Sequence, residues 1–232
     1  MKIERTLFWF KDGDEILSDL NERFFSLGTL LNRLLNEKYF GKRIQFINLD
    51  FSTERTYELY PKVPVNEQYF YGGHLRYFGV FDFTQFNNIT NDEQYMYVWN
   101  KSYEFLSNAS KAIKNDKLFE ASSYAYQRGM ELNLNPDYRV IEKKINFFGK
   151  QLNASVWINF KEDGMHSKFT LEKGSEVVYE KNIDNTKNGV ELFLEMYKEI
   201  TQDNDNIIIK GRKDVQYLPL KIPLETIKLK II

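Results

Sequence analysis

Apolar and polar residues alternate most regularly between residues 152 and 161, where every second residue is apolar. This period of two is typical of a β-strand with one buried face. Asp163-Gly164 follows, and this dipeptide is a strong signal for a two-residue hairpin turn. A second turn is predicted at Lys173-Gly174-Ser175. The segment 152–183 is therefore predicted to be an antiparallel meander with strands at 152–161, 165–172 and 176–183.

The two turns also predict which residues of the meander face each other. Closing them places Ile158 opposite Phe169, and Phe169 opposite Tyr179, so that apolar side chains meet on one face. On the other face Lys168 lies opposite Glu180, and such pairs of opposite charge stabilise antiparallel sheets. Both turns therefore predict the same buried face.

Helical periodicity and helix-end signals mark three segments between residues 14 and 133. Between residues 14 and 39, apolar side chains recur at spacings of three and four, which predicts a helix with one buried stripe. The stripe consists of Leu17, Leu20, Phe24, Leu27, Leu31 and Leu34. Thr90 and Glu93 form a capping-box pair that begins a second helix, which ends near residue 114. A third helix is predicted at 118–133, and it ends there because Pro136 cannot continue a helix.

The remaining elements are mostly strands, and the whole pattern indicates an α+β fold. Strands are expected at 3–10, 43–51, 55–60, 75–84, 138–148, 206–210, 214–219 and 226–231. One further helix is expected at 187–201. We therefore expect two α/β halves, residues 1–115 and 116–232, each with a mostly antiparallel sheet backed by helices. The halves are expected to pack as one compact unit.

The expected helix at 187–201 has two chemically different sides. Its buried side would consist of Val190, Phe193, Leu194, Tyr197 and Ile200. Glu191, Glu195 and Glu199 follow one another at i+4 steps on the opposite side, where like charges slightly destabilise a helix. Two interpretations stay open for these glutamates: an ordinary solvated surface, or an acidic docking surface for a basic partner.

Residues 67–83, EQYFYGGHLRYFGVFDF, are unusually rich in aromatic side chains and include one of the two histidines of the chain. From residue 75 onward an apolar face alternates with a mixed face, which is typical of a strand with one side in the core. His74, Arg76 and Asp82 fall on the mixed face. They are either satisfied at the ends of a core strand or gathered around a small polar pocket.

Trp157 falls on the polar face of the meander, beside Thr170 and Val178 of the neighbouring strands. Charged or polar side chains surround this small cluster: Lys161, His166, Lys168 and Glu180. A tryptophan with a charged rim resembles the centre of a protein-binding hot spot. The alternative is that the ring is buried in a seam between the two halves.

Composition and charge argue against several classes of protein. The net charge is −1, with acids and bases interspersed, whereas nucleic-acid binders normally show a basic stripe. The chain has no cysteine, which excludes disulfides, cysteine-bound zinc and thiol nucleophiles. Two isolated histidines without an HExxH motif predict no transition-metal site. No apolar stretch approaches the length of a membrane span, so a cytoplasmic protein without a membrane partner is expected.

The usual sequence motifs of catalysis are missing as well. We find no G-x-S-x-G nucleophile elbow, no P-loop and no dinucleotide-binding fingerprint. A site made only of carboxylates stays open, because thirty-three acidic residues are present. We therefore expect no cofactor, no bound metal and no catalytic residue.

These observations favour a non-enzymatic protein-binding module. In general character the chain is similar to bacterial immunity proteins, which neutralise a toxin by stoichiometric binding, although fold does not imply function. The residues expected to contact such a partner, a basic toxin domain being one candidate, are Trp157, Lys168, Thr170, Val178, Glu191, Glu195 and Glu199. The alternative is a small-ligand-binding or enzymatic domain with a pocket near His74, Arg76 and Asp82.

Overall fold

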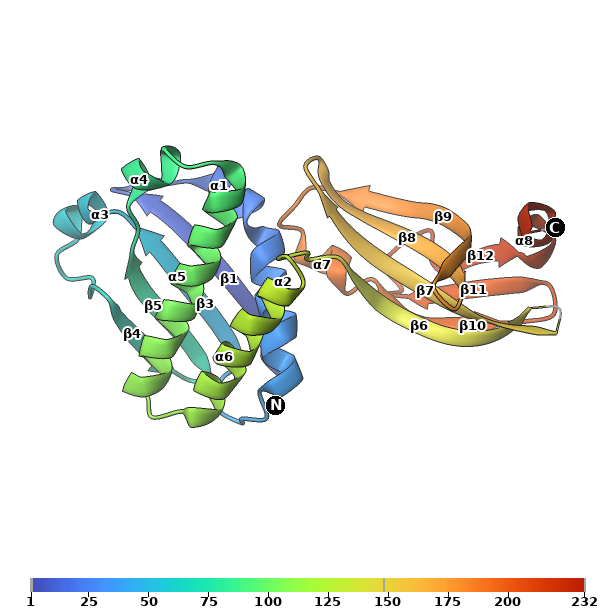
Figure 1. The fold of residues 1–232 in the computed structure, drawn as a ribbon, viewed down its shortest axis with the longest axis horizontal. Coiled ribbons are helices and arrows are strands. Elements are labelled where there is room, and N and C mark those ends of the chain that lie inside the picture. The colour runs from blue at the N-terminus through green and yellow to red at the C-terminus, as the bar shows by residue number, and fades with distance from the viewer. Residues whose placement is uncertain (1, 148, 232) are drawn as a thin grey trace. The chain divides into compact units, whose positions relative to one another are not determined.

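A computed structural model describes residues 2–147 and 149–231 of the chain (Figure 1). The fold is α+β, and its three sheets, taken together, are mostly antiparallel, as the sequence predicts. The chain divides into two compact units, Met1–Pro136 and Asp137–Ile232. Each unit has its own hydrophobic core and its own sheets.

The N-terminal unit is built on a five-stranded sheet with the strand order β2-β1-β3-β5-β4. Its strands are β1 (Arg5–Asp12), β2 (Glu15–Ile16), β3 (Phe46–Ser52), β4 (Glu67–Tyr71) and β5 (His74–Val80). The three central strands β1, β3 and β5 run parallel, while β2 and β4 are antiparallel at the two edges. The antiparallel expectation therefore does not hold for the centre of this sheet, where long connections separate β1, β3 and β5, as parallel neighbours require.

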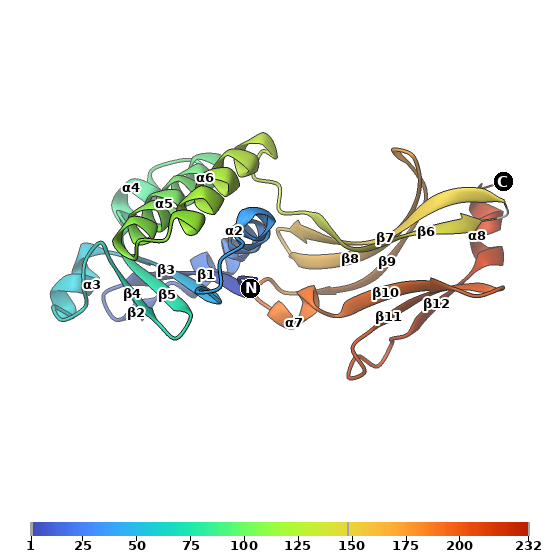
Figure 2. The same cartoon turned by 90° about the horizontal axis from the view of Figure 1, so that it is seen from below.

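Helices cover one face of this sheet. The helices of the N-terminal unit are α1 (Ser18–Arg23), α2 (Phe25–Lys38), α3 (Glu54–Leu59), α4 (Phe83–Asn87), α5 (Asn91–Ala112) and α6 (Asp116–Glu131), and α3 lies at the end of the sheet outside this layer (Figure 2). Figure 2 shows α2, α5 and α6 on the same side of the sheet. Their buried side chains join the inward side chains of β1, β3 and β5 in one core that is rich in aromatic rings. These rings account for much of the aromatic content of the chain, because each buries a large apolar area.

Two glycines allow close packing within this core. A Cβ atom at Gly79 of β5 would lie 2.0 Å from Cζ of Phe105 on α5, a separation that real atoms do not adopt. A Cβ atom at Gly129 of α6 would lie 2.2 Å from Cζ2 of Trp99 on α5. The aromatic rings of α5 therefore lie directly on backbone at both contacts.

The helices α5 and α6 begin where the sequence predicts. The Thr90 hydroxyl accepts a hydrogen bond from the backbone N–H of Glu93, whose carboxylate accepts the backbone N–H of Thr90. Asn115 caps α6 by accepting the N–H of Leu118. Because α6 packs against α2 and α5, it belongs to the N-terminal unit. The expected division at 115/116 therefore lies too early, and the unit ends after Pro136.

The C-terminal unit consists of two sheets with two short helices. The first sheet has the order β6-β7-β8-β9 and the second β10-β11-β12. The elements are β6 (Tyr138–Phe147), β7 (Lys150–Lys161), β8 (Gly164–Lys173), β9 (Glu176–Thr186), α7 (Glu191–Leu194), β10 (Tyr197–Gln202), β11 (Asn206–Gly211), β12 (Leu220–Pro223) and α8 (Leu224–Ile231). Within this unit the two sheets form two layers, with buried residues contributed by both (Figure 2).

The predicted meander is present as β7, β8 and β9, but its register differs from the prediction. Ile158 pairs with Ser167 rather than Phe169, since the turn residues are Glu162 and Asp163 and not Asp163-Gly164. Gly164 already pairs with Lys161, and a Cβ atom there would lie 2.2 Å from the backbone oxygen of Thr186. The shift is an even number of residues, so the buried face stays the same.

The register between β8 and β9 also differs from the prediction. Phe169 pairs with Lys181 rather than Tyr179, and the register shifts twice along the ladder. Lys168 pairs with Asn182, yet its ammonium group still reaches Glu180 at 3.0 Å. The expected ion pair therefore forms along a diagonal and not between directly opposite residues.

The expected helix at 187–201 is wrong. Only Glu191–Leu194 (α7) is helical there, and Tyr197–Gln202 forms the strand β10. Phe193, Tyr197 and Ile200 are buried in either arrangement, so their spacing did not decide between the two. In the structure β10 pairs with β11, so the backbone groups of residues 197–202 are satisfied between strands and not within a helix.

Three other segments also differ from expectation. Residues 55–60 lie mainly in the helix α3 and residues 226–231 in the helix α8, while 214–219 form a turn instead of a strand. These are short apolar runs, in which periodicity does not separate helix from strand. The expected strand at 138–148 corresponds to β6, and residue 148 itself lies outside the described residues.

Replacing Gly79 with alanine tests the close contact between β5 and α5. Because the new methyl group must displace the Phe105 ring, we expect the free energy of unfolding to fall by about 1–3 kcal/mol. The double variant Gly79→Ala/Phe105→Leu should recover part of this loss, since leucine lacks the ring. Urea unfolding of the three proteins measures both effects, and an unchanged midpoint in Gly79→Ala would contradict the contact.

Candidate functional site

One face of the N-terminal sheet carries no layer of helices in the part of the unit that the structure describes (Figure 2). Its side chains alternate with those that enter the core, and the strand pairing arranges them in rows across β1, β3, β5 and β4. We call this surface the open face. Its rows are Arg5, Phe46, His74 and Tyr71; Leu7, Asn48, Arg76 and Tyr69; and Trp9, Asp50, Phe78 and Glu67.

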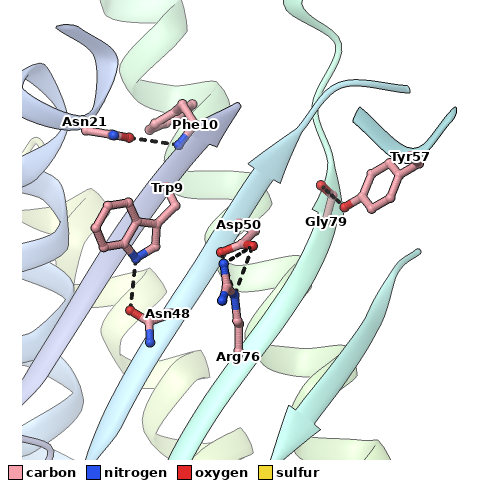
Figure 3. A network of polar contacts seen from close by, with 8 residues as sticks. All are labelled: Trp9, Phe10, Asn21, Asn48, Asp50, Tyr57, Arg76 and Gly79. Carbon is pink, nitrogen blue, oxygen red and sulfur yellow. Dashed lines mark hydrogen bonds and ion pairs between the residues drawn. The ribbon is translucent and has the colours of Figure 1, made fainter. Parts of the chain in front are cut away.

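An ion pair lies at the centre of the open face. Arg76 of β5 donates to Asp50 of β3 through Nε at 3.0 and 3.1 Å and through Nη2 at 2.8 Å (Figure 3). The Asp50 side chain is only 3% exposed, whereas that of Arg76 is 39% exposed. The guanidinium group also lies over the ring of Phe78, 5.2 Å from its centroid. Arg76 is therefore held in one orientation with part of its guanidinium group facing outward.

Burial raises the pKa of Asp50 above its ordinary value of 3.8, and the hydrogen bonds and charge of Arg76 oppose this rise. The carboxylate depends on Arg76 to stay ionised at low cost, because a buried charge without a partner is strongly unfavourable.

Tyr57 of α3 lies near the carboxyl end of β5, where its hydroxyl donates to the backbone oxygen of Gly79 at 3.0 Å. Burial raises the pKa of Tyr57 to about 12, so it stays a neutral donor.

Trp9 of β1 is also fixed in position. Its Nε1–H donates to Oδ1 of Asn48 on β3 at 3.0 Å, which orients the indole across these two strands (Figure 3). In the next row but one, the rings of Phe46 and His74 stack at 4.6 Å, and the guanidinium carbon of Arg5 lies 5.6 Å from the Phe46 centroid. Trp9, Phe46 and His74 are therefore ordered by neighbours within the sheet.

The most exposed rings of the open face lie on the edge strand β4. Tyr69 is 57% exposed and Tyr71 is 74% exposed. The sequence contained a signal for this strand, because Gly72-Gly73 is a two-residue hairpin turn that follows the aromatic segment 69–71. Because we did not predict β4, we did not expect an aromatic surface here. Trp9, Asp50 and both tyrosines were therefore not among the predicted site residues.

The three residues of the expected polar pocket do not converge. His74 begins β5 and stacks on Phe46, Arg76 binds Asp50, and Asp82 follows the opposite end of the strand. The Asp82 carboxylate accepts the backbone N–H of Gln85 and so caps α4. Each of the three side chains therefore makes a separate contact, His74 and Arg76 on β5 and Asp82 just after it.

The acidic docking surface expected on a helix at 187–201 does not form, because that helix is absent. Glu191 lies in α7, Glu195 follows it, and Glu199 lies on β10, where it binds Lys210 at 3.2 Å. Glu195 and Glu199 are exposed and Glu191 is half-buried. The three glutamates therefore do not share one regular surface.

The Trp157 cluster forms a closed network on the four-stranded sheet. Trp157 Nε1 donates to Oγ1 of Thr170 at 3.1 Å and to Oε1 of Glu172 at 3.2 Å. The Arg139 guanidinium lies 4.7 Å from the indole centroid and binds Glu172 at 2.6 Å. Trp157 is thus half-buried by residues of its own unit.

The other predicted members of this cluster are placed differently. Lys168 pairs with Trp157 across the strands and binds Glu180. Val178 lies where the register between β8 and β9 shifts, and is half-buried. The structure therefore brings Trp157, Lys168 and Thr170 together, and adds Arg139 and Glu172, which sequence reasoning missed.

A second polar chain lies inside the C-terminal unit. The hydroxyl of Tyr197 is 2.7 Å from that of Ser167 and 3.0 Å from that of Tyr217, which donates to Asp184 at 2.9 Å. Burial raises the pKa of Tyr197 and of Tyr217, so both stay neutral donors. These bonds connect β8 and β9 with β10 and the turn before β12, a structural role.

A cavity of about 320 Å³ lies at the carboxyl ends of β1, β3 and β5. Its polar groups already serve the fold: Asp12 accepts from Thr53 at 2.7 Å and binds Arg55 at 3.4 Å. Throughout residues 2–147 and 149–231, no group of three or more His, Asp or Glu residues is placed to hold a metal ion. None of the helices in these ranges is long and apolar enough to cross a lipid bilayer.

Comparisons with known proteins identify no relative: no protein-family model, no characterised protein and no solved structure matches this chain. Any functional conclusion therefore depends on the geometry of the chain itself.

Replacing Arg76 with alanine tests the ion pair of the open face. The variant leaves a buried carboxylate unpaired, so we expect a loss of about 3 kcal/mol at neutral pH, the lower end for a buried pair because Arg76 is partly exposed. A raised pKa in the folded state means that the penalty disappears as Asp50 becomes protonated. The loss should therefore shrink as the pH falls through the pKa of Asp50, towards 3.8.

Chemical unfolding at several pH values measures this dependence. The matched control is Arg76→Ala/Asp50→Asn, which removes both charges and should recover much of the stability at neutral pH. Equal stability of Arg76→Ala and the wild type at neutral pH would show that the pair does not stabilise the sheet.

Replacing Trp157 with phenylalanine tests the network of the C-terminal unit. The variant keeps a ring beneath Arg139 but removes the N–H donor to two buried acceptors, so we expect a loss of about 1–3 kcal/mol. Trp157→Ala should cost more, because it also removes the ring. Thermal unfolding measures both losses, and two variants as stable as the wild type would mean that the network is dispensable for folding.

Proposed function

We propose that this protein is a non-enzymatic protein-binding module whose partner docks on the open face of the N-terminal sheet. The observation that carries the proposal is the set of side chains on this face: Trp9 on β1, Arg76 on β5, and Tyr69 and Tyr71 on β4. Tryptophan, tyrosine and arginine are the residues most enriched at the energetic centres of protein interfaces.

The rigidity of these side chains supports the same proposal. Trp9 is held by Asn48, and Arg76 is held by Asp50. Because both side chains are already ordered in the free protein, binding costs less conformational entropy. A sheet face with ordered anchors and two exposed tyrosines at its edge is suited to a partner of fixed shape.

We further propose that the module acts as an inhibitor of the immunity-protein kind, which occludes a toxin by binding it one to one. Its general likeness to such proteins and a rigid, aromatic docking surface support this assignment. The glutamates at 191, 195 and 199 have no part in it, because they do not form one surface.

Two exposed tyrosines allow the docking surface to be tested without disturbing the fold. We expect Tyr69→Ala and Tyr71→Ala to unfold like the wild type, and each to weaken partner binding by about 1–2 kcal/mol. The matched control is Tyr60→Ala, a residue that is 46% exposed after α3 and outside the open face. Partners are first purified from the source cells on the wild-type chain, and binding of each purified partner is then measured by calorimetry.

The stoichiometry of the complex and the effects of the three variants on its affinity decide between this proposal and its alternatives. A one-to-one complex that is weakened by both open-face variants and unaffected by Tyr60→Ala supports docking on the open face. A partner that binds all four proteins equally would contradict it. For the inhibitor assignment, the product of a toxin-like gene beside this one should lose its activity on forming the complex, and full activity in the complex would refute that assignment.

A further inference from the structure

A second surface adjoins the open face at the amino-terminal ends of β1, β3 and β5. Three segments meet there: residues 2–5, the loop 39–45 and the β4–β5 turn. The backbone N–H groups of Gln45 and Phe46 both donate to the oxygen of Gly73, at 2.8 and 3.1 Å, and Glu4 donates to the oxygen of Gln45 at 2.7 Å. These bonds fix the three segments side by side.

Two large aromatic side chains project from this edge. Phe40 and Tyr71 are each 74% exposed, more than any other large hydrophobic residue in the described part of the chain. The loop that carries Phe40 is anchored, since the neighbouring Tyr39 is buried and its hydroxyl accepts the N–H of Ile44 at 3.2 Å. Phe40 is thus exposed on an ordered loop.

Cations lie beside these two rings. Lys42 and Arg43 are exposed, and neither makes an ion pair with any described residue. The guanidinium of Arg43 lies 5.6 Å from the ring centroid of Phe70, and that of Arg5 lies over Phe46. We call Arg5, Phe40, Lys42, Arg43 and Tyr71 the amino-edge patch.

The opposite end of the sheet carries acids instead. Acidic residues found there, at the carboxyl ends of the parallel strands and in the segments that follow them, are Asp12, Asp14, Glu15, Glu54 and Asp82. Each end also carries charges of the other sign: Glu4 lies at the amino-terminal end, and Lys11, Lys62 and the Arg55 that binds Asp12 lie at the carboxyl end. The sheet therefore has an excess of base at one end and an excess of acid at the other, although the chain as a whole is nearly neutral. Such an arrangement orients a docking partner by charge complementarity.

We infer that the amino-edge patch binds an acidic segment of a protein partner, with apolar side chains of that segment packing on the exposed rings of Phe40 and Tyr71. The inference rests on the proposed function, because it names the chemistry of the partner that docks on the adjoining open face. Exposed aromatic rings supply the anchor that loses its water on binding, and Lys42 and Arg43 supply the charge.

A protein segment fits this patch better than a nucleic acid does. A continuous phosphate backbone requires a stripe of cations, and the net charge of the chain is −1. Here the exposed cations Lys42 and Arg43 lie together at one end of the sheet, and Glu67 and the acids of the opposite end would repel a polyanion that followed the strands. A short acidic segment avoids that repulsion.

The test uses four probes on the full chain: a short Glu-rich peptide with one central Phe, the Lys-rich peptide of the same pattern, a single-stranded oligothymidine, and phosphatidylglycerol vesicles. We expect the Glu-rich peptide to shift the backbone NMR signals of residues 40–45 and 71–74, more strongly at low salt than at high salt. The Lys-rich peptide should not shift these signals.

The variant Lys42→Glu/Arg43→Glu should weaken binding of the Glu-rich peptide by about tenfold or more. Its matched control is Lys62→Glu, an exposed lysine between α3 and β4 at the other end of the sheet, which should bind as the wild type does. Both replaced positions in the first variant are exposed, so the fold is retained, and thermal unfolding checks this.

Every outcome of the test decides the inference. Absent shifts with the Glu-rich peptide, or equal binding by the variant and the wild type, would overturn it. Tighter binding of oligothymidine or of the vesicles to the same residues would reassign the patch to a nucleic acid or a membrane surface. Peptide binding at the patch, combined with partner complexes that Tyr69→Ala leaves unchanged, would refute the proposed function while the patch stands.

Discussion

The buried contact between Asp50 and Arg76 is the interaction on which the open face depends. It joins two parallel strands through side chains, and it places a charge in the middle of a surface that is otherwise largely aromatic. Burial of the Asp50 carboxylate is costly unless Arg76 stays bound to it. The arginine side chain is therefore held in this position even when no partner protein is bound. The same constraint keeps the guanidinium beside Phe78 and leaves part of it accessible.

The position of the helices explains why this surface stays open. α2, α5 and α6 pack on one side of the sheet, and the aromatic rings of α5 lie directly against glycines of β5 and α6. This side holds the core of the N-terminal unit, so the outward side chains are free to serve binding. Amphipathic alternation along β1 and β5 therefore places core residues on one face and Trp9, Arg76 and their neighbours on the face for which we propose a docking role.

In the C-terminal unit, tryptophan, arginine and tyrosine side chains bind residues of their own unit. Trp157 and Arg139 are also stacked and hydrogen-bonded on a sheet, but their polar atoms bind Thr170 and Glu172 of the same unit. Tyr197 and Tyr217 likewise complete a chain of hydroxyl groups with Ser167 and Asp184. An aromatic residue with a charged neighbour is therefore not by itself a mark of a binding surface, and exposure separates Tyr69 and Tyr71 from Trp157.

Local patterns in the sequence determined the α+β class, the capping box at Thr90 and Glu93, the long helices α5 and α6 and the buried face of the meander, because each depends on residues close together in the chain. The sequence also contained the glycine turn before β5, although we did not predict the strand β4 from this turn. Only the tertiary structure decided the register, the β-strand at 197–202 and the open face. Each of these depends on a partner outside the segment itself: β9 excludes a side chain at Gly164, β10 pairs with the next strand β11, and Asp50 meets Arg76 only when β3 and β5 become neighbours. Spacing along a chain cannot specify such contacts, since the same apolar positions are buried in more than one arrangement.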